Sequence, residues 1–322
     1  MWKQFLPDDN APGVAYWDSH WDEHDWFPEA LAFCAYEPLS EFLNRYTRPR
    51  DIVLDGGFGL GQHCIYWREQ GRNMVGVDYS WASAKRVRCR DETLPLAVAD
   101  VQTLPFRSNR FDAYLSGGVL EHFEHGPEQG LREAIRVLKP GGVLVGFMPF
   151  LNLERRLRAF FSGETIASEG RLSTSTTKAD PVKKLDGWRF HQYLFTKTEL
   201  EQALGHVGLE LLEQKPIGWQ WGLRDSPWLS GTWRRIETTI RGRVTARTQS
   251  GPTKGSAPVQ DEQPHAATRE GLLHRVAVSE IGKSAGESVL IRALQECFGH
   301  MGAFVARKPR IGSAVDARTS DP

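Results

Sequence analysis

The feature that most constrains the fold of this chain is a glycine-rich run at residues 53–61, which reads Val-Leu-Asp-Gly-Gly-Phe-Gly-Leu-Gly. The run begins inside a short apolar segment, 51–55, and leads into a segment with a helical pattern, 62–70. Glycines let the backbone turn sharply and let a ligand approach it closely. A strand, a glycine turn and a helix in this order are typical of doubly wound α/β sheets, which bind ligands at the carboxyl ends of their strands.

Short apolar segments alternate with helical patterns through this part of the chain. Such an alternation predicts βαβ units and a doubly wound, mostly parallel α/β sheet. The pair Thr196 and Glu199 has the spacing of a capping box and predicts a helix that ends at His206. Strands are expected at 51–55, 74–78, 96–100, 111–115, 143–147, 209–214 and 301–306, and further helices at 29–46, 62–70, 81–90 and 128–138.

The composition changes at 244–271, where Thr, Ser, Pro, Gly and Gln replace most apolar residues. This composition predicts a disordered loop. Because an apolar strand follows near the end of the chain, we interpret the surrounding region as an insertion rather than a separate C-terminal domain. The expected division is an N-terminal lid and helical segment at 1–50, the sheet core at 51–219, the insertion at 220–298, the last core strand at 299–310 and a disordered tail at 311–322.

The charges and cysteines exclude several classes of protein. Lys plus Arg and Asp plus Glu each number 40, and this balance argues against a general nucleic-acid binder. No apolar stretch approaches the length of a spanning helix, and the N-terminus lacks a signal-peptide core, so we expect a cytoplasmic protein. The cysteines lie far apart, which favours reduced thiols over a disulfide framework or a zinc site.

The spacing of the glycine turn indicates the kind of ligand. From Gly57 the pattern is G-x-G-x-G, and Gln62 stands where a dinucleotide fingerprint has its last glycine. Asp55 lies two residues before Gly57, where its carboxylate would repel a phosphate but attract the amino group of a zwitterionic, phosphate-free cofactor. These features count against an NAD-dependent oxidoreductase, which remains an alternative.

Acidic residues close three successive predicted strands. Asp55 ends the first, Asp78 ends the second and can accept hydrogen bonds from ribose hydroxyls, and Asp100 ends the third. Asp100 can accept from an adenine amino group while Val101 donates its backbone N–H, and Tyr79 can pack on the adenine ring. A single strand-end aspartate is more often a turn or helix cap. Three in register with a glycine turn predict a site for a nucleoside joined to an amino acid.

These segments together resemble class I S-adenosylmethionine-dependent methyltransferases, of the small-molecule type seen in quinone biosynthesis. The resemblance covers about residues 16–214 and returns at 299–308, and it is carried by VLDGGFGLG, VGVDYS, ADVQTLPFRSNRFD, GGVLEHF, RVLKPGGVL and HQYLFTKTELEQALGHVGLE. It implies a seven-stranded sheet with an antiparallel last strand, S-adenosylmethionine as the cofactor, and methyl transfer to a small-molecule acceptor. By resemblance, Asp55, Gly57, Gly59 and Gly61 hold the methionine part, Asp78 the ribose, and Asp100 and Val101 the adenine, while Ser116 and Gly117 border the sulfonium.

A general base is needed only when the acceptor is a hydroxyl or another protonated group. His122 is the best candidate, because imidazole titrates near neutral pH, and Glu121 lies beside it. Both residues can instead have structural roles. Some relatives bind a metal through E-x-x-E-H, but Gly118 replaces the first Glu here, so we expect no metal.

The acceptor pocket has candidate residues in two other parts of the chain. His191 and Tyr193 follow the fifth strand and are expected either to contact the acceptor or to belong to a packed loop. Tyr16, Trp17 and Trp21 are expected either to form a lid or to be ordinary core aromatics.

Two stretches, 153–161 and 229–243, combine apolar residues at helical spacing with arginines. Such helices can lie on a membrane surface, but more often they cover a pocket. The function predicted from the sequence is therefore O- or N-methylation of a small molecule, with an apolar or lipid-linked acceptor and peripheral membrane contact as hypotheses. A catalytically inactive protein that binds adenosyl ligands and acts as an interaction module is the alternative. The sequence does not indicate the oligomeric state of the protein.

Overall fold

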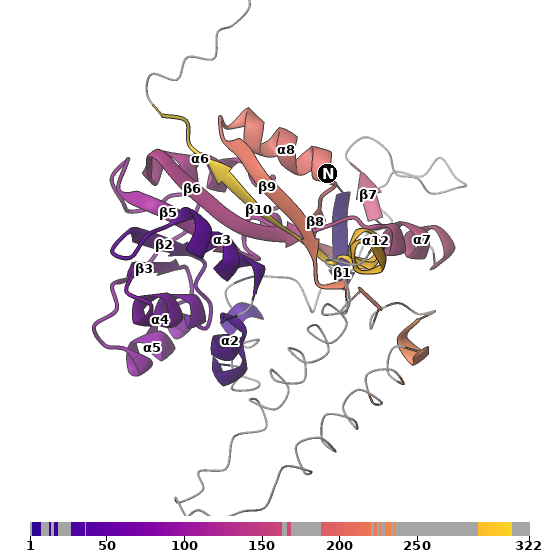
Figure 1. Cartoon of the computed structure of the whole chain (residues 1–322), viewed down its shortest axis with the longest axis horizontal. Helices are drawn as coiled ribbons and strands as arrows, with labels where there is room; N and C mark the ends of the chain where they lie inside the picture. Colours follow the sequence, from indigo (N-terminus) through magenta and orange to yellow (C-terminus); the bar gives the residue numbers. More distant parts are fainter. Residues whose placement is uncertain are drawn as a thin grey trace, which may run out of the picture.

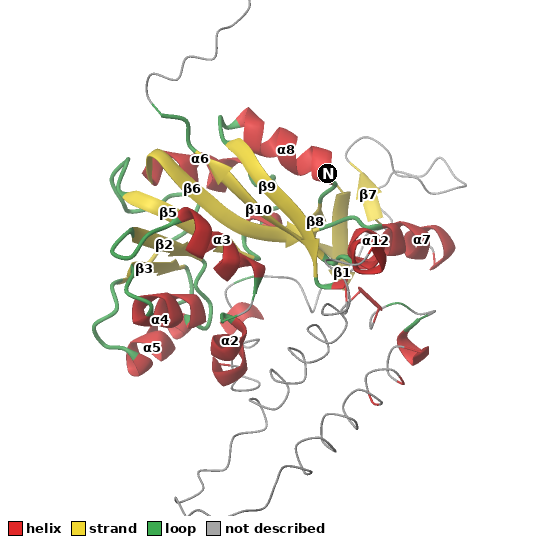
Figure 2. Ribbon diagram, viewed as in Figure 1, coloured by secondary structure: helices red, strands yellow, loops and turns green. Residues whose placement is uncertain are grey.

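The computed structural model describes residues 2–7, 13, 16–18, 27–35, 37–162, 166–168, 188–219, 222–223, 226, 229–232, 235, 238 and 289–310. In this part of the chain, a mixed sheet of seven strands lies between two layers of helices (Figures 1 and 2). The strand order is β4 (Leu96–Val98), β3 (Asn73–Asp78), β2 (Ile52–Gly56), β5 (Phe111–Gly117), β6 (Leu138–Pro149), β10 (Met301–Arg307) and β9 (Glu210–Ile217).

The first five strands of this order are parallel, and β10 is antiparallel to both of its neighbours. The predicted fold class, a doubly wound and mostly parallel seven-stranded sheet with an antiparallel last strand, is therefore confirmed. Strand β10 comes last in the chain but lies between β6 and β9. The last segment of the chain that pairs with the sheet thus completes its interior and does not extend its edge.

The sheet buries apolar side chains on both faces, as expected when helices cover both sides of parallel strands. On β2, Leu54 belongs to one core and the adjacent Val53 to the other, because successive side chains of a strand point to opposite faces. The first core includes residues of α6 (Glu128–Val137) and α8 (Lys197–His206), and the second includes residues of α3 (Pro38–Tyr46), α4 (Gln62–Glu69) and α5 (Trp81–Arg90).

Two helices replace the single helix that the sequence predicted over 29–46. They are α2 (Phe27–Phe33) and α3, so that prediction was wrong. Proline lacks an N–H donor, and inside a helix its ring clashes with an earlier carbonyl, whereas it is tolerated in the first turn. The chain accordingly leaves its helical path before Pro38, which begins α3.

A second, smaller sheet was not predicted. It has the order β7 (Ile166–Ser168), β1 (Trp2–Pro7) and β8 (Trp188–Leu194), with antiparallel pairing throughout. The segment around His191, which was expected to be either an acceptor-contacting segment or a packed loop, is thus a strand. The residues just after β8 and β6 form an isolated parallel bridge, in which the backbone N–H of Leu151 donates to the carbonyl of Phe195 at 2.8 Å.

Further helices include η2 (Leu120–His122), α7 (Leu153–Ser162) and α12 (Val289–Phe298). On α7, Leu153 and Leu157 are half exposed, but Arg155 is buried and its Nη1 donates to the carbonyl of Phe150 at 2.8 Å. Arg155 therefore does not belong to the basic face predicted for this helix. No helix of the described residues is long and apolar enough to cross a membrane.

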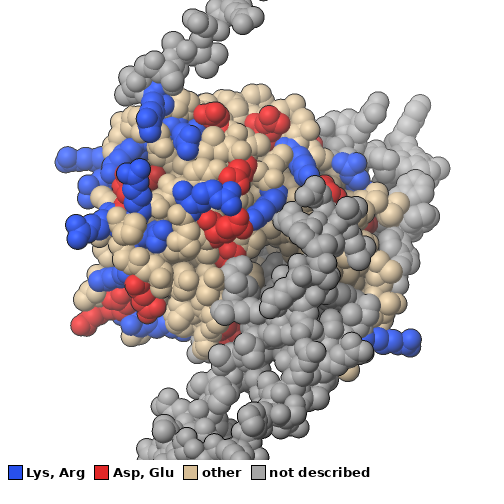
Figure 3. Space-filling view, in the orientation of Figure 1, with Lys and Arg blue, Asp and Glu red and all other residues tan. Residues whose placement is uncertain are grey.

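Several sequence predictions fall outside the described residues. These include Trp21, the predicted loop at 244–271, the tail at 311–322 and most of the second basic stretch. The face shown in Figure 3 carries both Lys and Arg and Asp and Glu side chains. Ion pairs join α3 to β9, where Arg45 contacts Glu41 and Glu213, each at 2.7 Å, and Lys215 contacts Glu41 at 2.5 Å.

Candidate functional site

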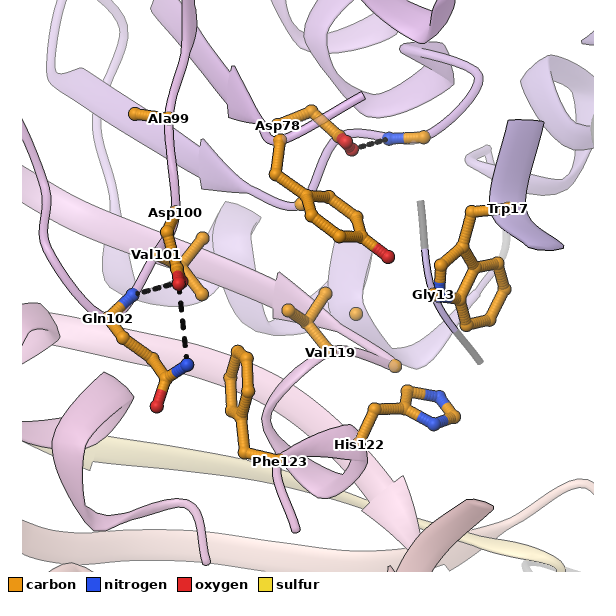
Figure 4. A pocket seen from close by; sticks show the side chains of 15 residues that line it. Gly13, Trp17, Asp78, Ala99, Asp100, Val101, Gln102, Val119, His122 and Phe123 are labelled. Atoms are coloured by element: carbon orange, nitrogen blue, oxygen red, sulfur yellow. Dashed lines mark hydrogen bonds between the residues drawn. The ribbon is translucent and has the colours of Figure 1, made fainter. Parts of the chain in front are cut away.

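A cavity of about 340 Å³ opens where the parallel strands β2, β3, β4 and β5 end (Figure 4). This position is the one at which doubly wound sheets bind ligands. Trp17 and His122 lie at one end of the view, and Asp100 and Gln102 lie at the other. The lining consists of Gly13, Trp17, Gly57, Gly59, Asp78, Tyr79, Ala99, Asp100, Val101, Gln102, Gly117, Gly118, Val119, His122 and Phe123.

The glycine turn forms one wall of the cavity, and its backbone requires glycine. Gly57 has a φ of +84°, in the left-handed region that other residues rarely adopt. A Cβ atom there would lie 2.4 Å from Cγ2 of Val119, which lines the same cavity. The N–H of Gly57 donates to the carbonyl of Val77 at 2.7 Å, so the turn is anchored to the end of β3.

Asp78, at the end of β3, connects the glycine turn to the next helix. Its Oδ2 accepts a hydrogen bond from the backbone N–H of Gly59 at 2.9 Å, and its Oδ1 accepts from the N–H of Ser80 at 2.8 Å. Burial raises the pKa of Asp78, while these backbone donors oppose the rise. The carboxyl group is thus held rigidly at the cavity wall, and each oxygen has acceptor capacity beyond the bond named here.

Tyr79, Asp100 and Val101 line the cavity beyond Asp78, in the region where the sequence predicted an adenine site. Oδ1 of Asp100 accepts from the N–H of Gln102 at 2.8 Å, so this aspartate also closes a tight turn. Burial and nearby carboxylates raise the pKa of Tyr79, and its hydroxyl is therefore protonated at neutral pH.

Three of the predicted cofactor residues do not belong to the lining. Asp55, Gly61 and Ser116 lie behind it, and Asp55 is only 2% exposed. Oδ2 of Asp55 accepts a weak hydrogen bond from Sγ of Cys64 at 3.4 Å. Burial raises the pKa of Asp55 to about 6, although the nearby His63 lowers it. Gly117 does line the cavity, beside Gly118.

His122 lies at the opposite end of the cavity from Asp100. Its Nδ1 is 2.8 Å from the main-chain carbonyl oxygen of His191 on β8, and its ring packs edge-on against Trp17, with centroids 5.2 Å apart. Burial lowers the pKa of His122. The ring of His191 lies 5.2 Å from that of His122, and burial together with His122 lowers the pKa of His191 to about 4. Both imidazoles are therefore neutral at pH 7.

Glu121 has a different environment from its neighbour. It is 1% exposed, it is not among the lining residues, and its Oε2 has no hydrogen-bond partner among the described residues. Burial raises its pKa to about 8, so the carboxyl group is mostly protonated at neutral pH. A protonated carboxyl group behind the wall is poorly suited to act as a base.

The N-terminal residues 16–18 lie against the site. The hydroxyl of Ser80 donates to Oδ1 of Asp18, and Nη2 of Arg86 donates to the Asp18 carbonyl at 3.2 Å. These contacts hold Trp17 at the cavity. Tyr193, in contrast, is fully buried and its hydroxyl donates to the Glu124 carbonyl at 2.8 Å, so it does not reach the lining.

The lining also contains residues that the sequence analysis did not select. Val119 and Phe123 are apolar and lie between His122 and Gln102 in Figure 4, and Gln102 lies beside Asp100. Their position in the sequence could have identified them, because Gln102 follows the end of a predicted strand by two residues and both Val119 and Phe123 lie within three residues of His122.

Comparison with known proteins adds three kinds of similarity. Residues 54–146 match a family model described as a methyltransferase domain. The chain is 35% identical over 106 residues to the ubiquinone/menaquinone biosynthesis C-methyltransferase of Laribacter hongkongensis, covering 31% of this chain and 43% of that protein. It is 29% identical over 178 residues to an uncharacterized protein of Methanocaldococcus jannaschii, covering 53% and 66%.

Among solved structures, the 1,6-didemethyltoxoflavin-N1-methyltransferase of Burkholderia thailandensis is 16% identical with a TM-score of 0.48, covering 95% of this chain and 96% of that one. The chain aligns with less than two-thirds of the length of the curated relatives named here. The segment matched by the family model contains the glycine turn, Asp78 and Asp100. The resemblance predicted from these residues is therefore confirmed.

Proposed function

We propose that this chain, whose residues 54–146 match the methyltransferase domain model, transfers a methyl group from S-adenosylmethionine to a small-molecule acceptor. The observation that carries the proposal is the shared cavity. The glycine turn, Asp78 and Asp100 line one space at the carboxyl edge of the sheet, with His122 at its other end. The acceptor atom we propose is an oxygen or a nitrogen.

The residues present fit the cofactor. A Cβ atom at Gly57 would press on Val119 across the lining, so glycine keeps this space open, and Asp78 offers a fixed carboxyl group to the ribose hydroxyls. Asp100, Val101 and Tyr79 would hold the adenine, and Gly117 would border the sulfonium. Asp55, Gly61 and Ser116 support these groups from behind. When bound, S-adenosylmethionine supplies a methyl group already activated on a sulfonium.

The protein's own task is to orient the acceptor and to accept its proton. The Nδ1–H of His122 donates to the His191 carbonyl, because a carbonyl oxygen can only accept, and Nε2 is therefore left as the basic nitrogen. Glu121 is set aside as the base because it is protonated and lies behind the wall. Trp17, Val119 and Phe123 would contact the acceptor, and these side chains favour an apolar one.

The experiment that tests the function is calorimetric titration with S-adenosylmethionine, S-adenosylhomocysteine and NAD in parallel, followed by an acceptor screen. We expect the two adenosyl ligands to bind. Asp78→Asn should weaken their binding by about 10- to 100-fold, because it removes a charge-assisted hydrogen bond to the ligand. Asp91→Asn, on a carboxylate at the end of α5 outside the lining, is the matched control. Binding of NAD alone, or of none of the three, would overturn the proposal.

A further inference from the structure

A cysteine, a glutamate and a histidine meet in the interior, away from the cavity. Sγ of Cys34, a carboxylate oxygen of Glu37 and a ring nitrogen of His63 all lie within 4.8 Å of one another. Cys34 follows α2, Glu37 precedes the first residue of α3, and His63 is in the first turn of α4. All three are buried, and none of them lines the cavity.

We propose that Cys34, Glu37 and His63 bind one zinc-class divalent metal ion. Thiolate sulfur, imidazole nitrogen and carboxylate oxygen are the three donor types that zinc takes in proteins. A thiolate and a carboxylate together carry the charge that a divalent cation neutralises, and the imidazole binds in its neutral form. The resulting site is electrically balanced, which a buried position requires.

The separations are compatible with this ion. Bonds of about 2.0 to 2.3 Å in a tetrahedral arrangement place the ligand atoms roughly 3.3 to 3.8 Å apart. Nε2 of His63 lies 2.6 Å from Oε1 of Glu37, so these two atoms must separate slightly to admit the metal. Three protein ligands occupy three positions, and a water molecule takes the fourth.

The surroundings support the carboxylate ligand. Oγ of Ser40 lies 3.5 Å from Oε1 of Glu37, where it can orient the group as a supporting hydrogen-bond donor. Without a metal, His63 pairs with Glu37, and Sγ of Cys34 donates a weak hydrogen bond to the carbonyl of Ala30 at 3.3 Å. A bound metal ion would replace these contacts with three bonds to one centre.

The proposed metal would connect the N-terminal helices to the glycine turn. His63 lies two residues after Gly61, and the next residue, Cys64, donates to Asp55 at the end of β2. Fixing His63 to the segments around α2 and α3 would therefore stabilise the turn from behind. No metal was expected from the sequence because the E-x-x-E-H pattern is incomplete at Gly118 and the cysteines form no close pair. A site that joins Cys34 and Glu37 to the distant His63 was not considered. The proposal does not depend on the identity of the acceptor or on turnover.

The test is metal binding to the full chain, purified without a metal-affinity tag and treated with a chelator. Co²⁺ is the probe, because a thiolate ligand gives it an intense charge-transfer absorption. We expect the band to saturate at one equivalent and to be displaced by Zn²⁺, and we expect Zn²⁺ to raise the midpoint of thermal unfolding. Cys34→Ser should lose the band, and His63→Gln should weaken Co²⁺ binding at least tenfold.

Cys89→Ser is the matched control, because Cys89 is an exposed cysteine on α5, and it should keep both the band and the stoichiometry. Circular dichroism of each variant establishes that it is folded. The wild-type titration remains decisive even when a variant fails to fold. Absence of a thiolate band in the wild type, persistence of the band in Cys34→Ser, or its loss in Cys89→Ser would each overturn the proposal.

Discussion

The ring of His122 and the main chain of His191 are joined by a 2.8 Å hydrogen bond between Nδ1 and the carbonyl oxygen. The bond connects η2, which follows β5 of the large sheet, to β8 of the small sheet. It places the Nδ1 proton and the basic lone pair on opposite sides of the ring. The small sheet therefore leaves Nε2 as the nitrogen of His122 that is able to accept a proton.

Replacing His122 with asparagine should lower kcat by about 10²- to 10⁴-fold for a hydroxyl acceptor, the usual contribution of a general base. The base acts in its neutral form, so wild-type kcat/KM should rise with pH through the pKa of His122. Burial lowers that pKa from its ordinary value of 6.5, which places the acid limb below pH 6.5. Measurement of kcat and kcat/KM as a function of pH for the wild type and the variant tests both predictions.

The control for this variant is His206→Asn, which changes an exposed histidine at the end of α8. It should leave the acid limb in place. An acid limb of unchanged midpoint in His122→Asn would mean that another group accepts the proton, or that the acceptor needs no base.

The large sheet and the cofactor end of the site could be predicted because their signals are local. Asp78 ends β3 and Asp100 follows the end of β4 by two residues, and parallel strands bring their carboxyl ends to one edge of the sheet. The small sheet depends on the pairing of residues 2–7 with residues 188–194. These segments are far apart in the sequence, and no short sequence motif predicts their pairing. The cluster of Cys34 and His63 was missed for the same reason.

Substitution of Gly57 should separate two effects of the glycine turn. Gly57→Ala places a Cβ atom 2.4 Å from Val119 at a φ of +84°, whereas Gly71→Ala meets nothing within 4 Å at a φ of +81°. Gly71→Ala should lose about 1–2 kcal/mol of unfolding free energy from backbone strain alone. Gly57→Ala should lose more, and it should also weaken S-adenosylhomocysteine binding at least about tenfold.

Urea unfolding and calorimetric titration of the two alanine variants measure these effects separately. Cofactor affinity that falls equally in both variants would show that global stability, and not the shape of the cavity wall, controls binding.

Removal of the Trp17 side chain should affect the acceptor more than the cofactor. Trp17 packs edge-on against His122 at 5.2 Å and lies far from Asp100 in the cavity. Such aromatic pairs contribute about 0.5–1.5 kcal/mol of stabilisation in addition to that expected from the area they bury. We expect Trp17→Ala to raise the KM for the acceptor several-fold and to change S-adenosylhomocysteine affinity less. Steady-state kinetics and titration provide the two values.

Trp81, which is 71% exposed on α5, provides the matched tryptophan control. Trp81→Ala should leave both values unchanged. If Trp17→Ala changes the affinity for S-adenosylhomocysteine more than the KM for the acceptor, Trp17 contacts the adenosyl group instead.

Glu121 should make the stability of the protein depend on pH. Its pKa is about 8 in the folded protein against an ordinary value of 4.5, so between these pH values the folded state binds more protons than the unfolded state. Stability must then fall as pH rises through this window, by at most about 1.4 kcal/mol per pH unit. Glutamine cannot ionise, and Glu121→Gln should therefore be more stable than wild type at pH 8, by about 2 kcal/mol or more, with little difference at pH 5.

Glu133→Gln tests the effect of a pKa shift in the opposite direction. Hydrogen bonds from Arg136 lower the pKa of Glu133, so its ionised form stabilises the fold above the ordinary pKa, and that contribution is lost as pH falls. This variant should be less stable than wild type at pH 7 and should approach it in acid. Urea unfolding of the wild type and both variants from about pH 3 to pH 8 gives the comparison, because the contribution of Glu133 is lost only below the ordinary pKa of 4.5. A Glu121→Gln curve parallel to that of the wild type would show that Glu121 ionises normally in the folded protein.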